Sequence, residues 1–432
     1  MKKNGASEKD IKASFYVETP MKIFSWKGDI DTLLTPYDSI RYSKFILQAG
    51  VLSTDPTTGH VKAWVGGIDL KHFKYEHVKQ GKRQVGSTFK PFVYATAINQ
   101  LGLSPCDEFP NTPCTIPAGK YYLDEDWTPR NSGDEYGGLR SLKNALANSI
   151  NVISANLIDQ TTPQNVVRMA KNLGVESDIP AVPSVALGTV DLSLYEMVGA
   201  LNTFANKGMY VKPMMILRIE DKNGTILEEF TPETKEVLSE SIAYTTINLM
   251  EGVTRYGSGI RLRTSGGKYP DNVATGYPYQ FDNAIAGKTG TTQNQSDGWF
   301  IGLVPNLSTG IWVGAEDRSV HFVDITRGQG ASMALPIWAL YMKRNYADED
   351  LEISKEDFET RDERVLVDEL FEVVYKHYQA KIERSAVAAF PVIKDVYEKQ
   401  GDRYERIVVP FTDGIKTLQV VTNLKEAYES KG

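Results

Sequence analysis

Apolar segments in this 432-residue chain come in pairs that are joined by short turns. Residues 47–67 predict strand, turn and strand, and residues 297–317 predict two apolar strands around a short turn. Residues 214–230 predict a hairpin with Asn223-Gly224 as its two-residue turn. Helices are predicted elsewhere, but they do not alternate with single strands as in parallel sheets. This arrangement indicates an α+β fold built on an antiparallel sheet.

Four segments carry helical signals. A helix should begin near Ser87, because Pro91 has no N–H group and is tolerated only in a first helical turn. Residues 141–160 place apolar side chains at steps of three and four, which predicts one amphipathic helix. Residues 165–175 predict a helix that a glycine ends, and residues 193–208 predict a helix that starts at a serine cap.

The composition excludes several classes of protein. The chain has 41% hydrophobic and 24% charged residues and a formal net charge of −7, as in ordinary soluble globular proteins. The mildly acidic balance, without a Lys/Arg stripe, argues against nucleic acid as a partner. The sequence contains no run of 18 or more apolar residues, so no membrane span is predicted. The N-terminus lacks the apolar core of a signal peptide, so a protein that works outside the cytoplasm would have lost its export signal here.

Changes in composition predict how the chain is organised. Residues 1–40 are polar and short on periodicity, which favours a linker or the remnant of an upstream segment. Residues 101–139 are dense in Pro, Gly, Asp and Asn, and a loop of that length is usually functional or disordered. Residues 347–432 begin with a charged run and form a predicted C-terminal appendage, in which residues 366–382 suit an amphipathic helix.

No metal or cofactor site is predicted. The histidines, which show no metal-binding spacing, are His60, His72, His77, His321 and His377. Cys106 and Cys114 share one loop, where a disulfide is possible in an oxidising compartment, although two cysteines without a catalytic role are favoured. Residues 287–292 resemble the end of a phosphate-binding loop. Asp282 stands where the first glycine of that motif should be, so ATP binding is disfavoured.

The tetrapeptide from Ser87 to Lys90 is the first segment that could carry chemistry. In a helix the serine hydroxyl and the lysine amine would share one face and could meet. A serine needs a neighbouring base to act as a nucleophile, and a lysine can serve if burial lowers its pKa. A helix start at Ser87 would also leave a backbone N–H free for a developing oxyanion. Taken alone, Ser-x-x-Lys favours an ordinary helix start.

Two further polar segments interrupt apolar elements. Ser149 and Asn151 lie in the amphipathic segment. In a core both side chains would need polar partners. If they face a cleft instead, Ser149 could relay a proton and Asn151 could hold a substrate amide. Residues 288–291, Lys-Thr-Gly-Thr, follow a strand-like segment and precede the next strand. A sheet edge that carries lysine and two threonines can bind an extended peptide and its carboxylate. Taken separately, each segment is weak evidence for a catalytic site.

Together the three segments appear in the order Ser-x-x-Lys, Ser-x-Asn and Lys-Thr-Gly, the signature of β-lactamases and penicillin-binding proteins. The chain resembles the transpeptidase domain of class A penicillin-binding proteins over residues 41–346. The resemblance implies a five-stranded antiparallel sheet flanked by helices, with the active site at the sheet edge. Bifunctional members of the family carry an upstream glycosyltransferase domain and a membrane helix. Neither is found in this sequence, so membrane attachment would come only through such segments.

The resemblance also implies a role for each motif residue. Ser87 would be the acylated nucleophile and Lys90 its base. Ser149 would pass a proton to the leaving amine, and Asn151 would bind the backbone of the acyl donor. Lys288 would supply positive potential.

Further roles follow from the same resemblance. Thr289 and Thr291, on either side of Gly290, would bind the carboxylate of the donor or of a β-lactam. The backbone N–H groups of Ser87 and Thr291 would form the oxyanion hole. The substrates would be peptidoglycan stem peptides that end in D-Ala-D-Ala, at the periplasmic face of the inner membrane. β-Lactam antibiotics would acylate the same serine, and no cofactor is implied.

Other functions stay open at this point. A D,D-carboxypeptidase would use water in place of the acceptor amine. A serine β-lactamase would need a deacylating glutamate, and Glu196, ahead of Leu201-Asn202, matches the E-x-x-L-N pattern poorly. A β-lactam sensor or cell-wall scaffold would keep the acylable serine without turnover.

The remaining segments have less specific interpretations. Residues after about 360 resemble a piece of the secretion motor ATPase, without a nucleotide-binding motif. Arg261 and Arg263 would either line the cleft or form structural ion pairs, and Trp299 and Phe300 would belong to the sheet core.

Overall fold

The computed structural model describes residues 5–263, 279–359, 408–409 and 418–419. The chain divides into two compact units, Met1–Glu359 and Thr360–Gly432. The second unit contributes two short antiparallel strands, β16 (Val408–Val409) and β17 (Leu418–Gln419). The amphipathic helix predicted for residues 366–382 lies outside the described residues.

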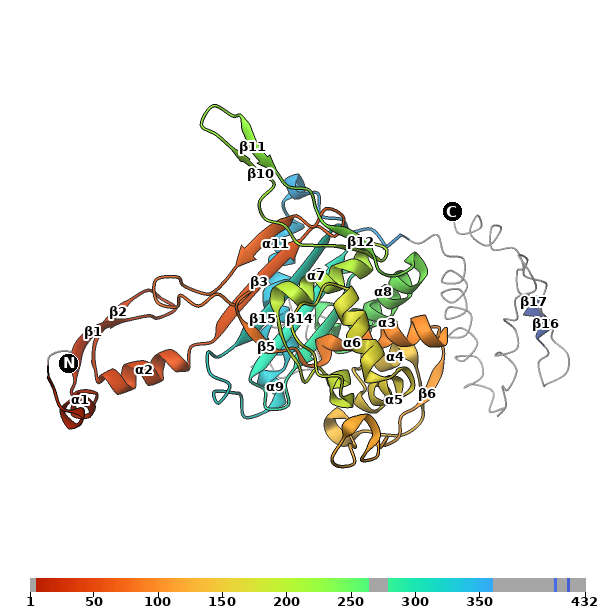
Figure 1. Ribbon diagram of the computed structural model, residues 1–432, viewed down its shortest axis with the longest axis horizontal. Helices are drawn as coiled ribbons and strands as arrows, with labels where there is room; N and C mark the ends of the chain where they lie inside the picture. The colour runs from red at the N-terminus through yellow and green to blue at the C-terminus, as the bar shows by residue number, and fades with distance from the viewer. Residues whose placement is uncertain (1–4, 264–278, 360–407, 410–417, 420–432) are drawn as a thin grey trace. The chain divides into compact units, whose positions relative to one another are not determined.

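A five-stranded antiparallel sheet forms the centre of the first unit (Figure 1). Its strands are β3 (Gln48–Thr54), β4 (Val61–Val65), β13 (Ala286–Thr291), β14 (Asp297–Val304) and β15 (Leu307–Gly314). They lie in the order β13-β14-β15-β3-β4, and each neighbouring pair is antiparallel. The predicted fold class is therefore confirmed, and β13, which carries the Lys-Thr-Gly segment, is an edge strand.

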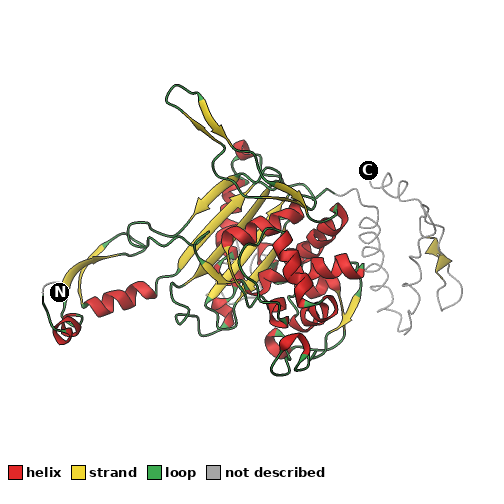
Figure 2. Ribbon diagram, viewed as in Figure 1, coloured by secondary structure: helices red, strands yellow, loops and turns green. Residues whose placement is uncertain are grey.

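Helices cover both faces of this sheet (Figure 2). They are α3 (Lys90–Leu101), α4 (Leu142–Ala147), α5 (Asn151–Thr161), α6 (Pro163–Asn172), α7 (Leu194–Ala205), α8 (Glu240–Arg255), α9 (Ile325–Gly328), α10 (Gly330–Met333) and α11 (Leu335–Asn345). Along β14, Trp299 and Ile301 pack into the core beneath α3, α7 and α8, whereas Phe300 packs with Trp338 of α11 in a second core. All residues of β14 and β15 are buried, which explains why the sequence shows continuous apolar runs.

Short elements surround the sheet. They are β5 (Lys82–Gln84), β6 (Glu108–Pro110), β7 (Leu139–Ser141), β8 (Asp191–Ser193), β9 (Met209–Val211), β12 (Thr234–Glu236) and the 3₁₀ turns η2 (Gly86–Phe89), η3 (Lys120–Tyr122), η4 (Ser132–Asp134), η5 (Pro183–Leu187), η6 (Ile260–Leu262) and η7 (Glu349–Leu351). Residues 101–139 thus contain only brief regular structure, as their composition predicted. Cys106 and Cys114, in that region, form no disulfide.

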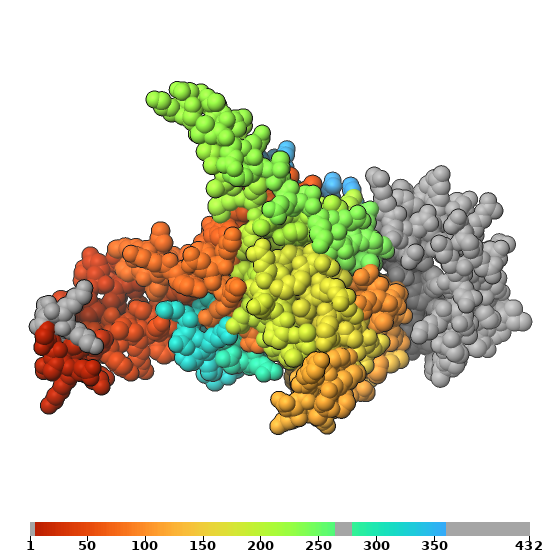
Figure 3. Space-filling view, viewed as in Figure 1, coloured from red at the N-terminus to blue at the C-terminus, as the bar shows by residue number. Residues whose placement is uncertain are grey.

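The hairpin of β10 (Arg218–Glu220) and β11 (Ile226–Glu229) stands out from the body of the unit (Figure 3). Its turn is longer than the two residues predicted, because Asp221 N–H donates to Thr225 O and closes a three-residue loop. The Asp221 carboxylate accepts from two backbone N–H groups of this loop, which stabilises the wider turn.

Residues 5–44 contain several short regular elements. They contain α1 (Glu8–Ser14), β1 (Thr19–Ile23) and β2 (Ile30–Leu34), and α2 spans Pro36–Lys44. Side-chain caps at Ser7 and Thr35 start the two helices, and these local signals are easily missed in a polar segment. Among the described residues, no helix is long and apolar enough to cross a bilayer.

Glycines allow four backbone segments to meet at one end of β13. An ideal Cβ on Gly188 would lie 1.8 Å from Gly86 O, and one on Gly290 would lie 2.6 Å from Val85 O. A Cβ on Gly330 would lie 2.3 Å from Gly290 O. No side chain fits in these gaps, so the backbone of η2 rests directly on the edge strand.

Gly188→Ala should destabilise the protein by about 3 kcal/mol or more, because the new Cβ would overlap the Gly86 carbonyl and the φ of +75° disfavours alanine. Gly102→Ala is the matched control, since Gly102 also has a positive φ, +65°, but has open space around it. It should cost about 1 kcal/mol. Urea unfolding measures both changes, and equal losses would contradict the proposed close contact.

Candidate active site

Ser87 lies in the 3₁₀ turn η2, directly before α3. The helix begins at Lys90 with Pro91 in its first turn, close to the start predicted from the sequence. Gly86 has a φ of +53°, and an ideal Cβ on it would lie 3.1 Å from Thr291 N. The backbone at Ser87 is therefore held beside the end of β13, with no side chain between the two segments.

Ser149 and Asn151 lie at a break between two helices, which corrects the prediction of one continuous helix over 141–160. Helix α4 ends at Ala147 and α5 begins at Asn151. Ser149 has a φ of +58°, and the Ile150 N–H donates to Ala145 O across the turn. A left-handed residue at this position ends a helix and turns the chain. The apolar periodicity continues across the break, so the sequence pattern did not reveal it.

Asn131, which sequence reasoning missed, supports this break from the long loop. Its side-chain oxygen accepts from Asn151 N–H (3.0 Å) and Val152 N–H (3.2 Å), the first donors of α5. Its amide nitrogen donates to Asn111 Oδ1 at 2.7 Å. Because these first N–H groups have no partner inside the helix, Asn131 acts as a cap supplied from a distant segment. The unusual length of residues 101–139 was the only signal for such a role.

The Lys90 amine is completely buried and turns towards the helix break. It donates to Ser149 O at 2.6 Å, to Asn151 Oδ1 at 2.7 Å and to Ser149 Oγ at 3.2 Å. The Asn151 amide nitrogen in turn donates to Arg130 O at 2.7 Å. Burial, together with the charge of Lys288, holds the pKa of Lys90 well below its usual value. The site therefore favours a neutral amine at this position.

Lys288 reaches the same serine from β13. Its buried amine donates to Ser149 Oγ at 3.0 Å and to Thr289 O at 3.1 Å. Burial lowers the pKa of Lys288 to about 7. The structure thus brings Lys90, Ser149, Asn151 and Lys288 into one hydrogen-bonded cluster, although they come from three distant parts of the sequence.

The Ser87 hydroxyl makes no hydrogen bond within the described parts of the chain, so the Lys90 amine is not hydrogen-bonded to it. All three donor positions of the Lys90 amine are directed at Ser149 and Asn151. Two of those partners, Ser149 O and Asn151 Oδ1, can only accept. A neutral amine would keep its two protons on them and leave its lone pair at the third position, where the hydroxyl of Ser149 lies in this structure.

The two threonines of β13 are held by residues that sequence reasoning did not single out. The Thr289 hydroxyl lies 2.6 Å from Ser258 Oγ, and the Thr291 hydroxyl accepts from Gly330 N–H at 3.0 Å. Because Thr291 Oγ1 already accepts one hydrogen bond, its own proton remains to be donated. Ser258 is fixed in turn by its N–H, which donates to Ala147 O at the end of α4.

Glu196, considered above as a deacylating base, belongs to a helix cap. It is the capping-box residue of α7, and its carboxylate accepts hydrogen bonds from Ser193, Ser177 and the Glu176 N–H. Burial alone would raise the pKa of Glu196, but the hydrogen bonds from Ser193 and Ser177 outweigh it, so the pKa is lowered. A fully bonded carboxylate of this kind is structural.

The other candidates also have structural surroundings. Arg261 donates to Ala331 O and Ser332 Oγ, and Arg263 donates to the carbonyls of Phe281 and Asn283. Trp299 and Phe300 are buried in the sheet core, as predicted. Within residues 5–263 and 279–359 there is no group of three or more His, Cys, Asp or Glu side chains that could hold a metal ion.

Comparison with known proteins connects this geometry to a family. The family model of the penicillin-binding protein transpeptidase domain matches residues 49–316, and that of the penicillin-binding protein middle domain matches residues 1–47. Penicillin-binding protein 1A of Aquifex aeolicus is 32% identical over 77% of this chain and 44% of its own length. The protein of the same name from Neisseria meningitidis serogroup A is 31% identical over 69% of this chain and 36% of its own. The chain therefore spans less than half of these relatives.

Solved structures share the fold. Penicillin-binding protein 1A from Haemophilus influenzae superposes with a TM-score of 0.61 at 24% identity, over 70% of this chain and 48% of that one. PonA1 from Mycobacterium tuberculosis in complex with penicillin V superposes with a TM-score of 0.58 at 22% identity, over 84% and 93% of the two chains. The transpeptidase match covers well over half of the sequence. The chain belongs to the penicillin-binding protein transpeptidase family.

Proposed function

We propose that this chain is a serine D,D-transpeptidase that crosslinks peptidoglycan stem peptides ending in D-Ala-D-Ala and is acylated by β-lactams. The observation that carries the proposal is the buried cluster of Lys90, Ser149 and Lys288 beside Ser87. A family that binds penicillin through a transpeptidase domain supports the same chemistry. Residues 41–346 would form the catalytic domain, on the periplasmic face of the inner membrane, and residues 347–432 an appendage.

Acylation would begin with Ser87 Oγ attacking the carbonyl carbon of the penultimate D-Ala. The serine proton would pass to the lone pair of neutral Lys90, whose two protons are held by Ser149 O and Asn151 Oδ1. The negative charge on the carbonyl oxygen would be stabilised by the N–H groups of Ser87 and Thr291. The close approach of the Gly86 backbone to the Thr291 backbone supports placing these two donors near each other.

The leaving D-Ala amine needs a proton, which Ser149 would supply. Once Lys90 has taken the Ser87 proton, its third N–H can donate to Ser149 Oγ, which also accepts from Lys288, so the O–H of Ser149 is free to point at the substrate. Ser149 would then regain a proton from Lys90. An amine of a neighbouring stem peptide would attack the ester at Ser87, and the same groups would act in reverse order to form the crosslink.

The substrate carboxylate would lie beside β13. Lys288 would provide the positive charge, and the hydroxyls of Thr289 and Thr291 would donate hydrogen bonds, while Gly290 lets η2 lie directly against this part of the strand. The fixed positions of both hydroxyls, set by Ser258 and Gly330 N–H, support this assignment.

Two related activities use the same serine. A D,D-carboxypeptidase would let water resolve the ester, and product analysis with a stem-peptide donor and an acceptor amine separates crosslinks from hydrolysis. A β-lactamase is disfavoured because the Glu196 carboxylate is already occupied by hydrogen bonds within α7 and its neighbouring turn.

Ser87→Ala should abolish labelling by a fluorescent penicillin, because the acylated oxygen is removed. Stability should change little, since the hydroxyl has no partner in the described structure. Gel fluorescence measures the label and thermal unfolding the stability. Ser184→Ala, at another partly buried serine, is the control and should label normally. Persistent labelling of Ser87→Ala would refute the assignment of the nucleophile.

The second-order acylation rate should follow a bell-shaped pH profile. Lys90 acts as a base only when neutral, so the rate falls as the pH drops through its lowered pKa. Lys288 binds a carboxylate only when charged, so the rate falls as the pH rises through about 7. Lys288→Met removes the neighbouring charge that lowers the pKa of Lys90. Its residual activity should lose the alkaline limb and show an acidic limb at higher pH, whereas an unshifted profile would contradict this coupling.

Glu196→Gln should leave the lifetime of the penicilloyl-enzyme unchanged, because the carboxylate caps α7 and takes no part in hydrolysis. Loss of its charge-assisted hydrogen bonds should lower the stability by about 2 kcal/mol. Mass spectrometry of the acyl-enzyme over time and urea unfolding measure the two effects. A markedly longer-lived ester in the variant would favour a β-lactamase.

A further inference from the structure

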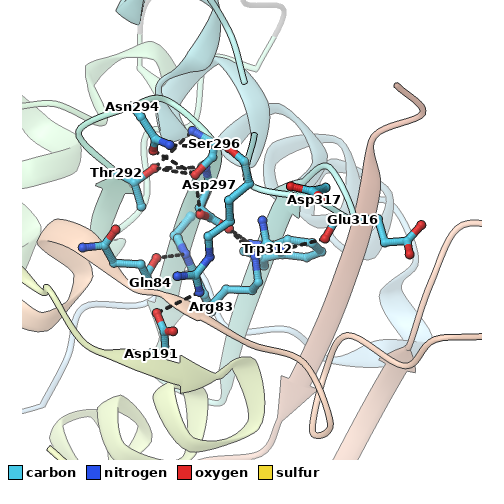
Figure 4. A network of polar contacts seen from close by, with 12 residues as sticks. Arg83, Gln84, Asp191, Thr292, Asn294, Ser296, Asp297, Trp312, Glu316 and Asp317 are labelled. Carbon is cyan, nitrogen blue, oxygen red and sulfur yellow. Dashed lines mark hydrogen bonds and ion pairs between the residues drawn. The ribbon is translucent and has the colours of Figure 1, made fainter. Parts of the chain in front are cut away.

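A buried ion pair links the segment before Ser87 to the segment after Thr291 (Figure 4). Arg83, in β5, lies four residues before Ser87, and its Nε donates to Asp297 Oδ1 at 2.6 Å. Asp297, the first residue of β14, lies six residues after Thr291. The Asp297 side chain is fully buried and that of Arg83 is 12% exposed. None of the sequence motifs includes either residue.

Asp297 fixes the turn between β13 and β14. Its Oδ1 also accepts from Trp312 Nε1 at 3.0 Å, and its Oδ2 accepts from Ser296 Oγ at 2.8 Å. Its backbone N–H donates to Thr292 Oγ1 at 3.1 Å, which closes the turn that follows Thr291. The end of β13 is therefore anchored through this one carboxylate and its neighbours.

Arg83 and Gln84 fix β5 from the other side. The Arg83 Nη1 donates to Glu316 O at 3.2 Å, and the guanidinium lies 5.1 Å from the ring centroid of Trp312. The Gln84 carbonyl accepts from Trp299 Nε1 at 2.9 Å, and β5 pairs with β8 along its other edge. The chain leading to Ser87 thus has little freedom to shift along the sheet.

We propose that the Arg83–Asp297 pair is a positioning device for acylation. It fixes the distance from the Ser87 nucleophile to Thr291, which supplies an oxyanion donor and part of the carboxylate site. The scissile carbonyl must lie between these two residues. This inference rests on the proposed function, because it assigns a role in that reaction to residues that touch no substrate. Small displacements of reacting groups lower rates steeply, so loss of the pair acts on the chemical step more than on binding.

The pair also contributes to folding, and its two roles can be separated. Removing one partner leaves a buried charge without compensation, which lowers the free energy of unfolding. Replacing both partners by uncharged residues of similar shape lowers it much less. If the pair were purely structural, the double variant would therefore regain stability and acylation activity together. If the pair positions the reacting groups, the double variant would regain stability but not acylation activity, because the link between β5 and β14 stays broken.

The test measures penicillin acylation by stopped flow, separating the dissociation constant of the initial complex from the acylation rate constant, alongside thermal unfolding. Arg83→Met should lower the acylation rate constant at least tenfold, change the dissociation constant less than threefold and lower the melting temperature. Arg83→Met combined with Asp297→Asn should recover melting temperature while the acylation rate constant stays low.

Two controls complete the experiment. Asp191→Asn breaks the exposed Arg318–Asp191 pair in the same region and should leave acylation unchanged. Leu173→Ala destabilises the core at a residue distant in sequence from both Ser87 and Thr291, and it should lower the melting temperature without changing the acylation rate constant. The inference is overturned if the acylation rate constant follows the melting temperature across all variants. A wild-type chain that is never acylated would instead overturn the proposed function.

Discussion

The site depends on the contact between two backbones that have no side chains between them. Gly86 and Gly290 bring η2 against β13, while Gly188 and Gly330 let a loop and α10 close around them. The oxyanion hole of the proposed reaction, formed by the N–H groups of Ser87 and Thr291, would depend on this approach. The motif glycine, Gly290, is thus one of four, and the other three were not visible as functional residues in the sequence.

Burial of two lysines in one cluster sets the electrostatics. Water would keep both amines charged, but exclusion of water lowers both pKa values, and the charge of Lys288 lowers that of Lys90 further. The hydroxyl oxygen of Ser149 lies between the two amines, 3.2 Å from that of Lys90 and 3.0 Å from that of Lys288. A serine in a left-handed conformation is uncommon, and here it is what places one hydroxyl within reach of two segments.

The sequence predicted the sheet and the helical segments that became α3 to α7, because hairpin patterns, caps and short motifs are local, but it did not predict α1, α2 or α8 to α11. It failed where tertiary contacts decide the local structure. The break at Ser149 is stabilised by Asn131 from a remote loop, and no periodicity reveals such a cap. The partners of Lys90 could not be derived from helical spacing, since that spacing favoured Ser87 and the structure gives Ser149 and Asn151. The Arg83–Asp297 pair joins residues more than two hundred positions apart.

If the proposed function holds, the cap provided by Asn131 would have a consequence for resistance to β-lactams. The loop that carries it is held to α5 by hydrogen bonds from two N–H groups, and the same loop binds the Asn151 amide through the Arg130 carbonyl. A substitution anywhere in that loop that pulls the cap away would tilt Asn151 and release one acceptor of Lys90. Under the proposed function, selection by a β-lactam would therefore also act on loop positions that never touch the drug.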